Sequence, residues 1–218
     1  MPVPSLGPAP FLYPIVDVAL CVARGLDAVS VAGSYLAGGA RVLQIRQKEG
    51  SSGAFLAIAE RIVRGARGGE AAIIINDRAD IARLSGAAGV HVGQEDLRVE
   101  DVLAVAGARA IVGLSTHDEA QVDAALSGPA AYVAVGPIFG TSTKDTGYSA
   151  RGLDLVRYAA GRGKPVVAIG GITLENARSV VEAGASGVAV ISDLLADADP
   201  EARTRRIIAE LSSNPSRS

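Results

Sequence analysis

Short apolar runs alternate along this chain with segments whose apolar residues recur every three or four positions. The runs are rich in Val, Ile and Ala, as the buried strands of parallel sheets are. They fall at Leu12–Val16, Val42–Arg46, Ala72–Ile75, Gly89–Val92, Ile111–Ser115, Tyr132–Val135, Pro165–Ile169 and Gly187–Ile191. The segments between them have helical spacing, as in the stretch from Ala54 to Val63. This pattern predicts about eight strands that alternate with helices.

Two architectures alternate strands and helices in this way, the (β/α)8 barrel and the doubly wound open sheet. The open sheet usually has fewer strands and a Gly-rich nucleotide motif after the first one. Residues Asp17–Arg24 follow the first run and contain no such motif. We therefore predict a single (β/α)8 TIM barrel over residues 11–212, with a flexible N-terminal segment at 1–10 and a tail at 213–218. The chemistry of such barrels lies at the carboxyl ends of the strands.

Composition narrows the classes of function. Of 218 residues, 49% are hydrophobic and only 4% aromatic, which favours a core of small aliphatic side chains. The net charge of −2 argues against a nucleic-acid partner. No apolar run approaches the roughly 18 residues of a membrane-spanning helix, and the single Cys21 fits a reducing compartment. We expect a soluble, cytoplasmic protein, while the sequence leaves homo-oligomer formation open.

Carboxylates follow two neighbouring predicted strands. Asn76 and Asp77 come at the end of the third strand, and Asp96 comes shortly after the fourth. Because parallel strands end at the same edge of a sheet, Asp77 and Asp96 are expected to be neighbours. Two such oxygen ligands suit Mg²⁺, which binds few protein carboxylates together with water and substrate phosphate. The alternative is that each aspartate caps the helix that follows it.

Basic residues lie at the end of the second predicted strand. Alternation along a strand sends Gln44, Arg46 and Lys48 to the same side. Next to the strand that ends at Asp77, a guanidinium and an ammonium group would form a diphosphate pocket together with the metal. The alternative is that both are ordinary solvated charges at a strand end.

The fifth predicted strand ends at Ser115, which we expect to donate a hydrogen bond to substrate. His117 follows it and is either a general base or a helix cap, and the cap is favoured because nothing near it in the sequence would orient the ring. His91 lies inside a strand and is expected to be a hydrogen-bonded residue of the barrel core.

Later loops are suited to binding phosphate. The loop after the sixth strand is long and carries three hydroxyls and a lysine, which predict either an oxyanion-binding loop or a flexible surface loop. Gly171 follows the seventh strand, and Ile191 and Ser192 follow the eighth, where backbone N–H groups often hold a phosphate. Two anion sites on one face predict an enzyme with two substrates. The residues of the long loop are Thr141, Ser142, Thr143 and Lys144.

Taken together, these motifs resemble the thiamine phosphate synthase (thiamine-phosphate pyrophosphorylase) family, from about Leu12 to the last helix. Two segments depart from it, since Ile45 stands where Leu is more common and Asp145–Ser149 replaces a Pro-rich stretch. The motifs that carry the resemblance are Gln44-Ile45-Arg46-Gln47-Lys48, Asn76-Asp77-Arg78, His91–Leu97, Gly113–His117, Gly136–Phe139, Thr141–Lys144 and Ala168–Ile172.

The resemblance implies a reaction between hydroxymethylpyrimidine diphosphate and a thiazole phosphate that gives thiamine phosphate and diphosphate. It implies a dissociative mechanism, with Mg²⁺ on Asp77 and Asp96. The residues it assigns to the pyrimidine diphosphate are Gln44, Ile45, Arg46, Gln47, Lys48, Asn76, Ser115 and Lys144, of which Arg46, Lys48, Ser115 and Lys144 are the expected catalytic groups. Those it assigns to the thiazole phosphate are Thr141, Ser142, Thr143, Gly171, Ile191 and Ser192.

Two other functions remain as alternatives. A thiazole tautomerase-like paralogue on the same barrel should keep the phosphate cradle but lack the full diphosphate and metal set, so Arg46, Asp77 and Asp96 argue against it. A non-catalytic sensor of a thiamine ligand would bind product without turnover. A metal pair that neutralises diphosphate would serve no purpose in such a sensor, although the sequence alone does not separate the two.

Overall fold

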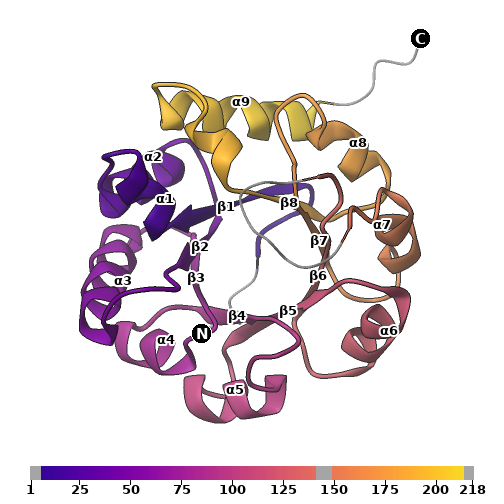
Figure 1. Cartoon of the computed structure of the whole chain (residues 1–218), viewed down its shortest axis with the longest axis horizontal. Coiled ribbons are helices and arrows are strands. Elements are labelled where there is room, and N and C mark those ends of the chain that lie inside the picture. Colours follow the sequence, from indigo (N-terminus) through magenta and orange to yellow (C-terminus); the bar gives the residue numbers. More distant parts are fainter. Residues whose placement is uncertain (1–5, 141–148, 214–218) are drawn as a thin grey trace.

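The computed structural model describes residues 6–140 and 149–213, and within these ranges eight parallel strands close into one barrel with helices around it (Figure 1). Each strand pairs with the next along the chain, and β8 pairs with β1. Closure through that last pair confirms the predicted (β/α)8 barrel and excludes the open sheet.

The predicted strands agree closely with the observed ones. The seventh begins at Val166 rather than Pro165, since proline has no N–H to donate to a neighbouring strand. The strands are β1 Phe11–Asp17, β2 Val42–Arg46, β3 Ala72–Asn76, β4 Gly89–Val92, β5 Ile111–Thr116, β6 Tyr132–Val135, β7 Val166–Ile169 and β8 Gly187–Val190. The helices are α1 Val18–Ala23, α2 Ala28–Ala37, α3 Ser52–Ala66, α4 Ala79–Ser85, α5 Val99–Ala106, α6 Glu119–Ser127, α7 Asp154–Ala159, α8 Ala177–Glu182 and α9 Pro200–Ser212, with a 3₁₀ turn, η1, at Ser192–Leu195.

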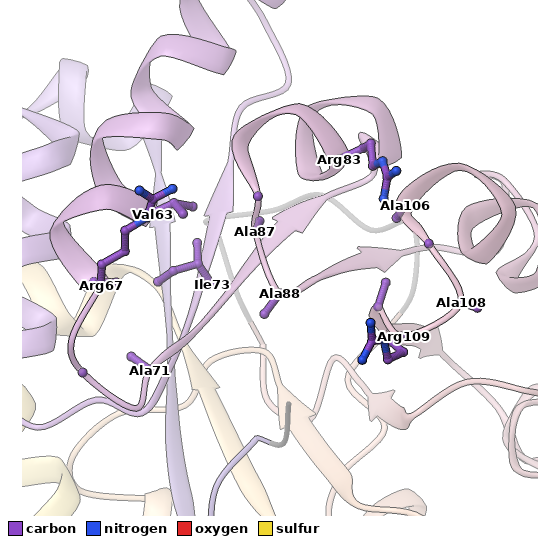
Figure 2. Close-up of a pocket in the computed structure, with 15 residues that line it drawn as sticks. Val63, Arg67, Ala71, Ile73, Arg83, Ala87, Ala88, Ala106, Ala108 and Arg109 are labelled. Carbon is purple, nitrogen blue, oxygen red and sulfur yellow. The ribbon is translucent and has the colours of Figure 1, made fainter. Parts of the chain in front are cut away.

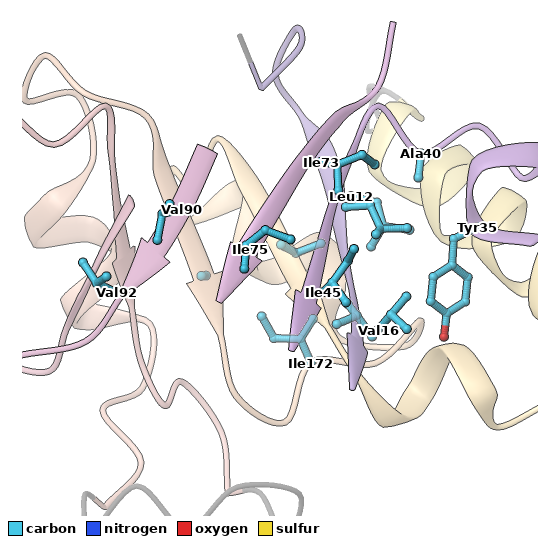
Figure 3. Close-up of a cluster of buried hydrophobic side chains, with 14 of the residues drawn as sticks. Leu12, Val16, Tyr35, Ala40, Ile45, Ile73, Ile75, Val90, Val92 and Ile172 are labelled. Carbon is cyan, nitrogen blue, oxygen red and sulfur yellow. The ribbon is translucent and has the colours of Figure 1, made fainter. Parts of the chain in front are cut away.

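Alternation along the strands divides the apolar side chains into two layers. One layer lies between the strands and the helices, and Figure 3 shows Leu12, Ile45 and Ile75 of the strands in this layer with Tyr35 of α2 nearby. The other layer fills the barrel interior, and it includes Tyr13 of β1. Strands buried on both sides explain why the sequence shows continuous apolar runs.

The barrel interior is packed around large side chains. A Cβ atom at Gly113 of β5 would lie 2.0 Å from the ring of Tyr132, so glycine leaves the space that this ring fills. Leu6 is 6% exposed and packs in the same interior layer as Phe11. The chain therefore contacts the barrel from Leu6 onward, while residues 1–5 of the expected flexible segment lie outside the described ranges.

No helix in the described part of the chain is both long enough and apolar enough to cross a lipid bilayer.

Candidate active site

A cavity of about 390 Å³ lies at the carboxyl ends of the strands, in the size range of small-molecule sites. Side chains of all eight strands listed above reach it, together with the loops that follow them. Ten of the residues predicted for catalysis, binding or metal line it, and these are Gln44, Arg46, Lys48, Asn76, Asp77, Asp96, Ser115, Gly171, Ile191 and Ser192.

The two described cations from β2 and its loop are already paired with carboxylates. Register places Asp17 of β1 opposite Arg46, and the two form an ion pair in which the Arg46 side chain is only 18% exposed. Lys48 pairs with Asp77 and is 48% exposed. Each cation in the cavity is therefore neutralised by a neighbouring carboxylate. An anion can bind Arg46 or Lys48 only by displacing that carboxylate.

Neither Asp77 nor Asp96 caps a helix, so the capping alternative is wrong. Helices α4 and α5 begin after Arg78 and Arg98, without a side-chain cap in either case. Asp77 has φ 59°, a left-handed conformation that no other non-glycine residue in the described ranges adopts. Asp96 instead accepts a hydrogen bond from the N–H of Gly93 at 2.7 Å.

The electrostatics of this carboxylate pair suit a cation. Burial raises the pKa of Asp77, the hydrogen bond and charge of Asp96 raise it further, and Lys48 opposes the shift without cancelling it. Within the described residues no cluster of three or more His, Cys, Asp or Glu side chains is arranged for a metal. A pair of carboxylates beside an open cavity is nevertheless a set that Mg²⁺ uses, with water and substrate oxygens as its other ligands. The residues present therefore fit Mg²⁺.

A hydrogen-bonded network, absent from the sequence predictions except for His91, Gln44 and Ser115, forms the cavity floor. The Gln44 amide donates to the Tyr13 hydroxyl at 3.2 Å, and that hydroxyl lies 2.8 Å from the Tyr132 hydroxyl. His91 joins Tyr132, 2.9 Å from Nδ1, to Ser115, 2.8 Å from Nε2. Burial raises the pKa of both tyrosines, so they stay neutral. Both tyrosines occupy inward-facing positions of their strands, β1 and β6, and this alternation is the sequence signal that could have placed them in the barrel interior.

Asn76 carries a polar group that lacks a partner. Its side chain is 7% exposed, and its Nδ2 atom makes no hydrogen bond with any described residue. A buried donor left without a partner costs about 1–3 kcal/mol, and a ligand in the cavity would remove that cost.

The favoured reading of His117 as a helix cap is wrong. Asp118 caps α6, since its Oδ1 accepts from the N–H of Gln121 at 2.8 Å. His117 lines the cavity, and its Nδ1 lies 2.6 Å from the carbonyl oxygen of Gly136, which accepts a hydrogen bond from it. The group that orients the ring follows the next strand, so its proximity was not visible in the local sequence.

The loops after β7 and β8 form the other side of the cavity. Gly170 and Gly171 have φ of 108° and 62°, and the Asn176 amide donates to the Gly171 carbonyl at 3.0 Å. Asp193 follows Ser192 and accepts from the N–H of Leu174 at 3.0 Å, which connects the two loops. These contacts fix Gly171 and Ser192 at one edge of the cavity.

Some predicted residues are not brought to this cavity. The Ile45 side chain is fully buried between the barrel and the helices, and Gln47 is not among the lining residues. Alternation explains both, because residues 45 and 47 point away from the side that Gln44 and Arg46 occupy. Thr141, Ser142, Thr143 and Lys144 lie outside the described residues.

A (β/α)8 barrel with cations, paired carboxylates and glycine-rich loops around one cavity defines an enzyme for phosphate-bearing small molecules. The chain belongs to a particular family of such enzymes, because the sequence model of the family described as "Thiamine monophosphate synthase" matches residues 12–194.

Individual relatives agree with this assignment. The chain is 44% identical to the thiamine-phosphate synthase of Koribacter versatilis, over 86% of this chain and 90% of the relative. It is 40% identical to that of a Roseiflexus species, over 97% and 93%. Among solved structures, the thiamine phosphate pyrophosphorylase from Pyrococcus furiosus aligns with a TM-score of 0.82 and 29% identity, over 93% of this chain and 97% of that one.

Proposed function

We propose that this chain joins hydroxymethylpyrimidine diphosphate to a thiazole phosphate, giving thiamine phosphate and diphosphate. Membership of the thiamine monophosphate synthase family supports the proposal. The observation that carries it is the grouping of Arg46, Lys48 and the partnerless Asn76 amide beside the carboxylates of Asp77 and Asp96. In the reaction the bond between the pyrimidine methylene carbon and the diphosphate oxygen breaks, and the thiazole nitrogen then forms a bond to that carbon.

Arg46 and Lys48 act on the leaving diphosphate. Negative charge grows on the diphosphate as its bond to carbon breaks, so fixed cations stabilise the transition state more than the bound substrate. On binding, the diphosphate takes the place that Asp17 and Asp77 hold beside these two cations. Lys144 is proposed to join them from the loop after β6.

Asp77 and Asp96 would hold Mg²⁺. When bound, the ion neutralises part of the charge of the diphosphate and so makes it a better leaving group. The pair of carboxylates supplies the oxygen ligands, and Lys48 keeps Asp77 ionised in part by its ion pair.

The floor of the cavity is proposed to position the pyrimidine ring. Tyr13 and Gln44 line the floor with neutral side chains, and the buried Tyr132 lies behind them in hydrogen-bond contact with Tyr13. Ser115 is held by the ring of His91 and faces the cavity, where its hydroxyl contacts the pyrimidine diphosphate. The side chains of the floor therefore offer no carboxylate of their own to a cationic pyrimidinylmethyl group, and the carboxylates of Asp77 and Asp96 lie with the diphosphate instead.

The thiazole phosphate is proposed to bind at the edge formed by Gly171, Ile191 and Ser192. Backbone N–H groups bind the phosphate there without a full positive charge, and Thr141, Ser142 and Thr143 would add hydroxyl donors from the loop after β6. Phosphate held at this edge places the thiazole nitrogen toward the pyrimidine at the cavity centre. We also propose that the enzyme works in the cytoplasm and that residues 11–212 form its single catalytic domain.

The test is product formation from the two purified substrates, first with Mg²⁺ and then with EDTA. Thiamine phosphate and diphosphate formed in equal amounts, and only with metal, would support the proposed reaction and its metal site. Product formation that persists with EDTA would refute the metal assignment alone. Folded protein that binds a thiazole phosphate but forms no product would refute the reaction and favour the tautomerase or the sensor.

A further inference from the structure

A second cavity lies at the opposite end of the barrel from the active site. It has a volume of about 660 Å³ and shares no lining residue with the catalytic cavity. Its walls come from the last turns of α3, α4 and α5 and from the turns that lead into β3, β4 and β5 (Figure 2). Among the residues that the structure describes, none assigned to the proposed reaction lines this second cavity, so the reaction does not account for it.

The charged side chains that line this second cavity are all positive. Arg67, Arg83 and Arg109 line it, and no acidic side chain of the described residues does. Figure 2 shows Arg67 on one side of the cavity, Arg83 and Arg109 on the other, and Ala87 and Ala88 between them. In the part of the chain that the structure describes, none of the three guanidinium groups forms an ion pair or a hydrogen bond. Three cations without partners thus gather around one hollow in a chain of net charge −2.

Helix capping is the structural alternative, because cations near helix C-termini are stabilised by the helix dipole. Arg83 lies in the last turn of α4, and Arg67 follows α3 directly. The chain shows elsewhere what such a cap looks like, since Lys164 donates to the carbonyl of Ala125 at 3.0 Å and to that of Gly128 at the end of α6. None of the three arginines makes a comparable bond to a described residue, so hydrogen-bonded capping does not account for their grouping.

We propose that this second cavity binds an organic phosphate. Guanidinium groups match phosphate oxygens in pairs, and three of them around one hollow oppose a multiply charged anion. The volume suits a small molecule, and Val63, Ile73 and the alanine-rich turns offer apolar walls to its organic part. The lining that the structure describes includes no aromatic side chain, so it offers no stacking surface of the kind that a single-stranded nucleic-acid site has. The inference does not depend on the proposed reaction.

The experiment measures binding of ADP and of inorganic pyrophosphate by calorimetry, in EDTA, with amide NMR shifts at Ala87, Ala88 and Gly107 to locate the site. The test variant is Arg83→Gln with Arg109→Gln. The matched control is Arg61→Gln with Arg64→Gln, which removes the same charge from exposed α3 positions outside the cavity. We expect the test variant to bind ADP at least roughly tenfold more weakly at this site, and the control to match the wild type. Steady-state turnover should be unchanged in both.

Several results would overturn the proposal. Equal weakening of ADP binding in the test and control variants would indicate general charge attraction. If ADP bound no tighter than pyrophosphate, the cavity would not recognise the organic part of a phosphate ligand. If the test variant kept the wild-type affinity for ADP but lost thermal stability, the arginines would serve to stabilise the helix C-termini. A dimer that the test variant dissociates would show that a second copy of the chain covers the cavity.

Discussion

Arg203 donates hydrogen bonds from Nη2 to both carboxylate oxygens of Asp193, each at 2.8 Å. Arg203 lies on α9 and is buried, whereas Asp193 follows Ser192 at the cavity edge. The same carboxylate accepts from the N–H of Leu174 in the loop after β7. One buried guanidinium thus connects the final helix to both loops of the proposed phosphate site.

Replacing Arg203 should therefore affect stability and one substrate together. Arg203→Met leaves Asp193 buried without its charged partner, which should lower the free energy of unfolding by about 3 kcal/mol. The KM for the thiazole phosphate should rise more than the KM for the pyrimidine diphosphate. Denaturant unfolding measures the loss of stability, and steady-state kinetics measures the two KM values. Arg205→Met is the control, because Arg205 pairs only with the exposed Glu201 on the same helix. Equal unfolding curves for the two variants would contradict this role.

Gly171 is a position where an added methyl group should harm binding. Its φ is 62°, and a Cβ atom there would lie 2.5 Å from the carbonyl oxygen of Gly140. Gly171→Ala should displace the loop after β6 and reduce kcat/KM for the thiazole phosphate roughly 10- to 100-fold. Gly161→Ala has the same backbone strain, with φ 72°, but no atom within 4 Å of the added methyl group. If both alanine variants lose activity equally, strain rather than the loop contact is the cause.

Arg46 should be required for turnover. Arg46→Ala should lower kcat roughly 10²–10³-fold at saturating substrate, because it removes a cation that stabilises the leaving diphosphate. We expect a loss of the same size for Lys144→Ala. Arg41→Ala provides the comparison, since Arg41 is exposed, precedes β2 at the end opposite Arg46 and pairs with Glu70. Turnover near that of the wild type in both test variants would refute the assigned roles.

The metal assignment is tested at the carboxylate pair. Asp77→Asn and Asp96→Asn should each raise the Mg²⁺ concentration for half-maximal activity. Loss of a residue that only supports a metal ligand typically weakens metal binding roughly 10–100-fold, so we expect the required Mg²⁺ concentration to rise by at least that factor. Asp80→Asn serves as control, because Asp80 is exposed and pairs with Arg78. An unchanged Mg²⁺ requirement in the two test variants would place the ion elsewhere.

Cys21 should resist alkylation in the folded protein. Burial, with the nearby charges of Asp17 and Asp27, raises the pKa of this thiol to about 11, so the reactive thiolate is scarce at pH 8. The reaction with iodoacetamide should quicken with each pH unit toward about 11 and should be fast at pH 8 only in denaturant. Because the pKa is raised in the folded state, the neutral thiol stabilises the fold below about pH 9 and this contribution is lost as pH rises toward 11. Rapid labelling of folded protein at pH 8 would contradict this environment.

The sequence predicted the barrel because its signals are local: apolar runs, helical spacing and the two-residue period of strands. The same period placed Gln44, Arg46 and Lys48 on one side correctly. It did not reveal that Asp17 pairs with Arg46, since that contact depends on the register between β1 and β2.

Features that join distant segments were missed for the same reason. The ring of His117 is oriented by a carbonyl from the next strand end, and the Tyr13–Tyr132 contact spans the barrel interior. The three arginines of the second cavity lie on separate helices and turns, so only the closed barrel brings them around one hollow. The loop carrying Lys144 remains a sequence prediction.

The ion pairs of Arg46 with Asp17 and of Lys48 with Asp77 have a consequence for the resting enzyme in the cell. A chloride ion that enters the cavity has to separate a carboxylate from each cation, and its single charge regains less than it displaces. In the proposed reaction a diphosphate carries several charges, and a metal on Asp77 and Asp96 would engage the displaced carboxylate, so more is recovered. We therefore expect the catalytic cavity to resist inhibition by common monovalent salts before any substrate arrives.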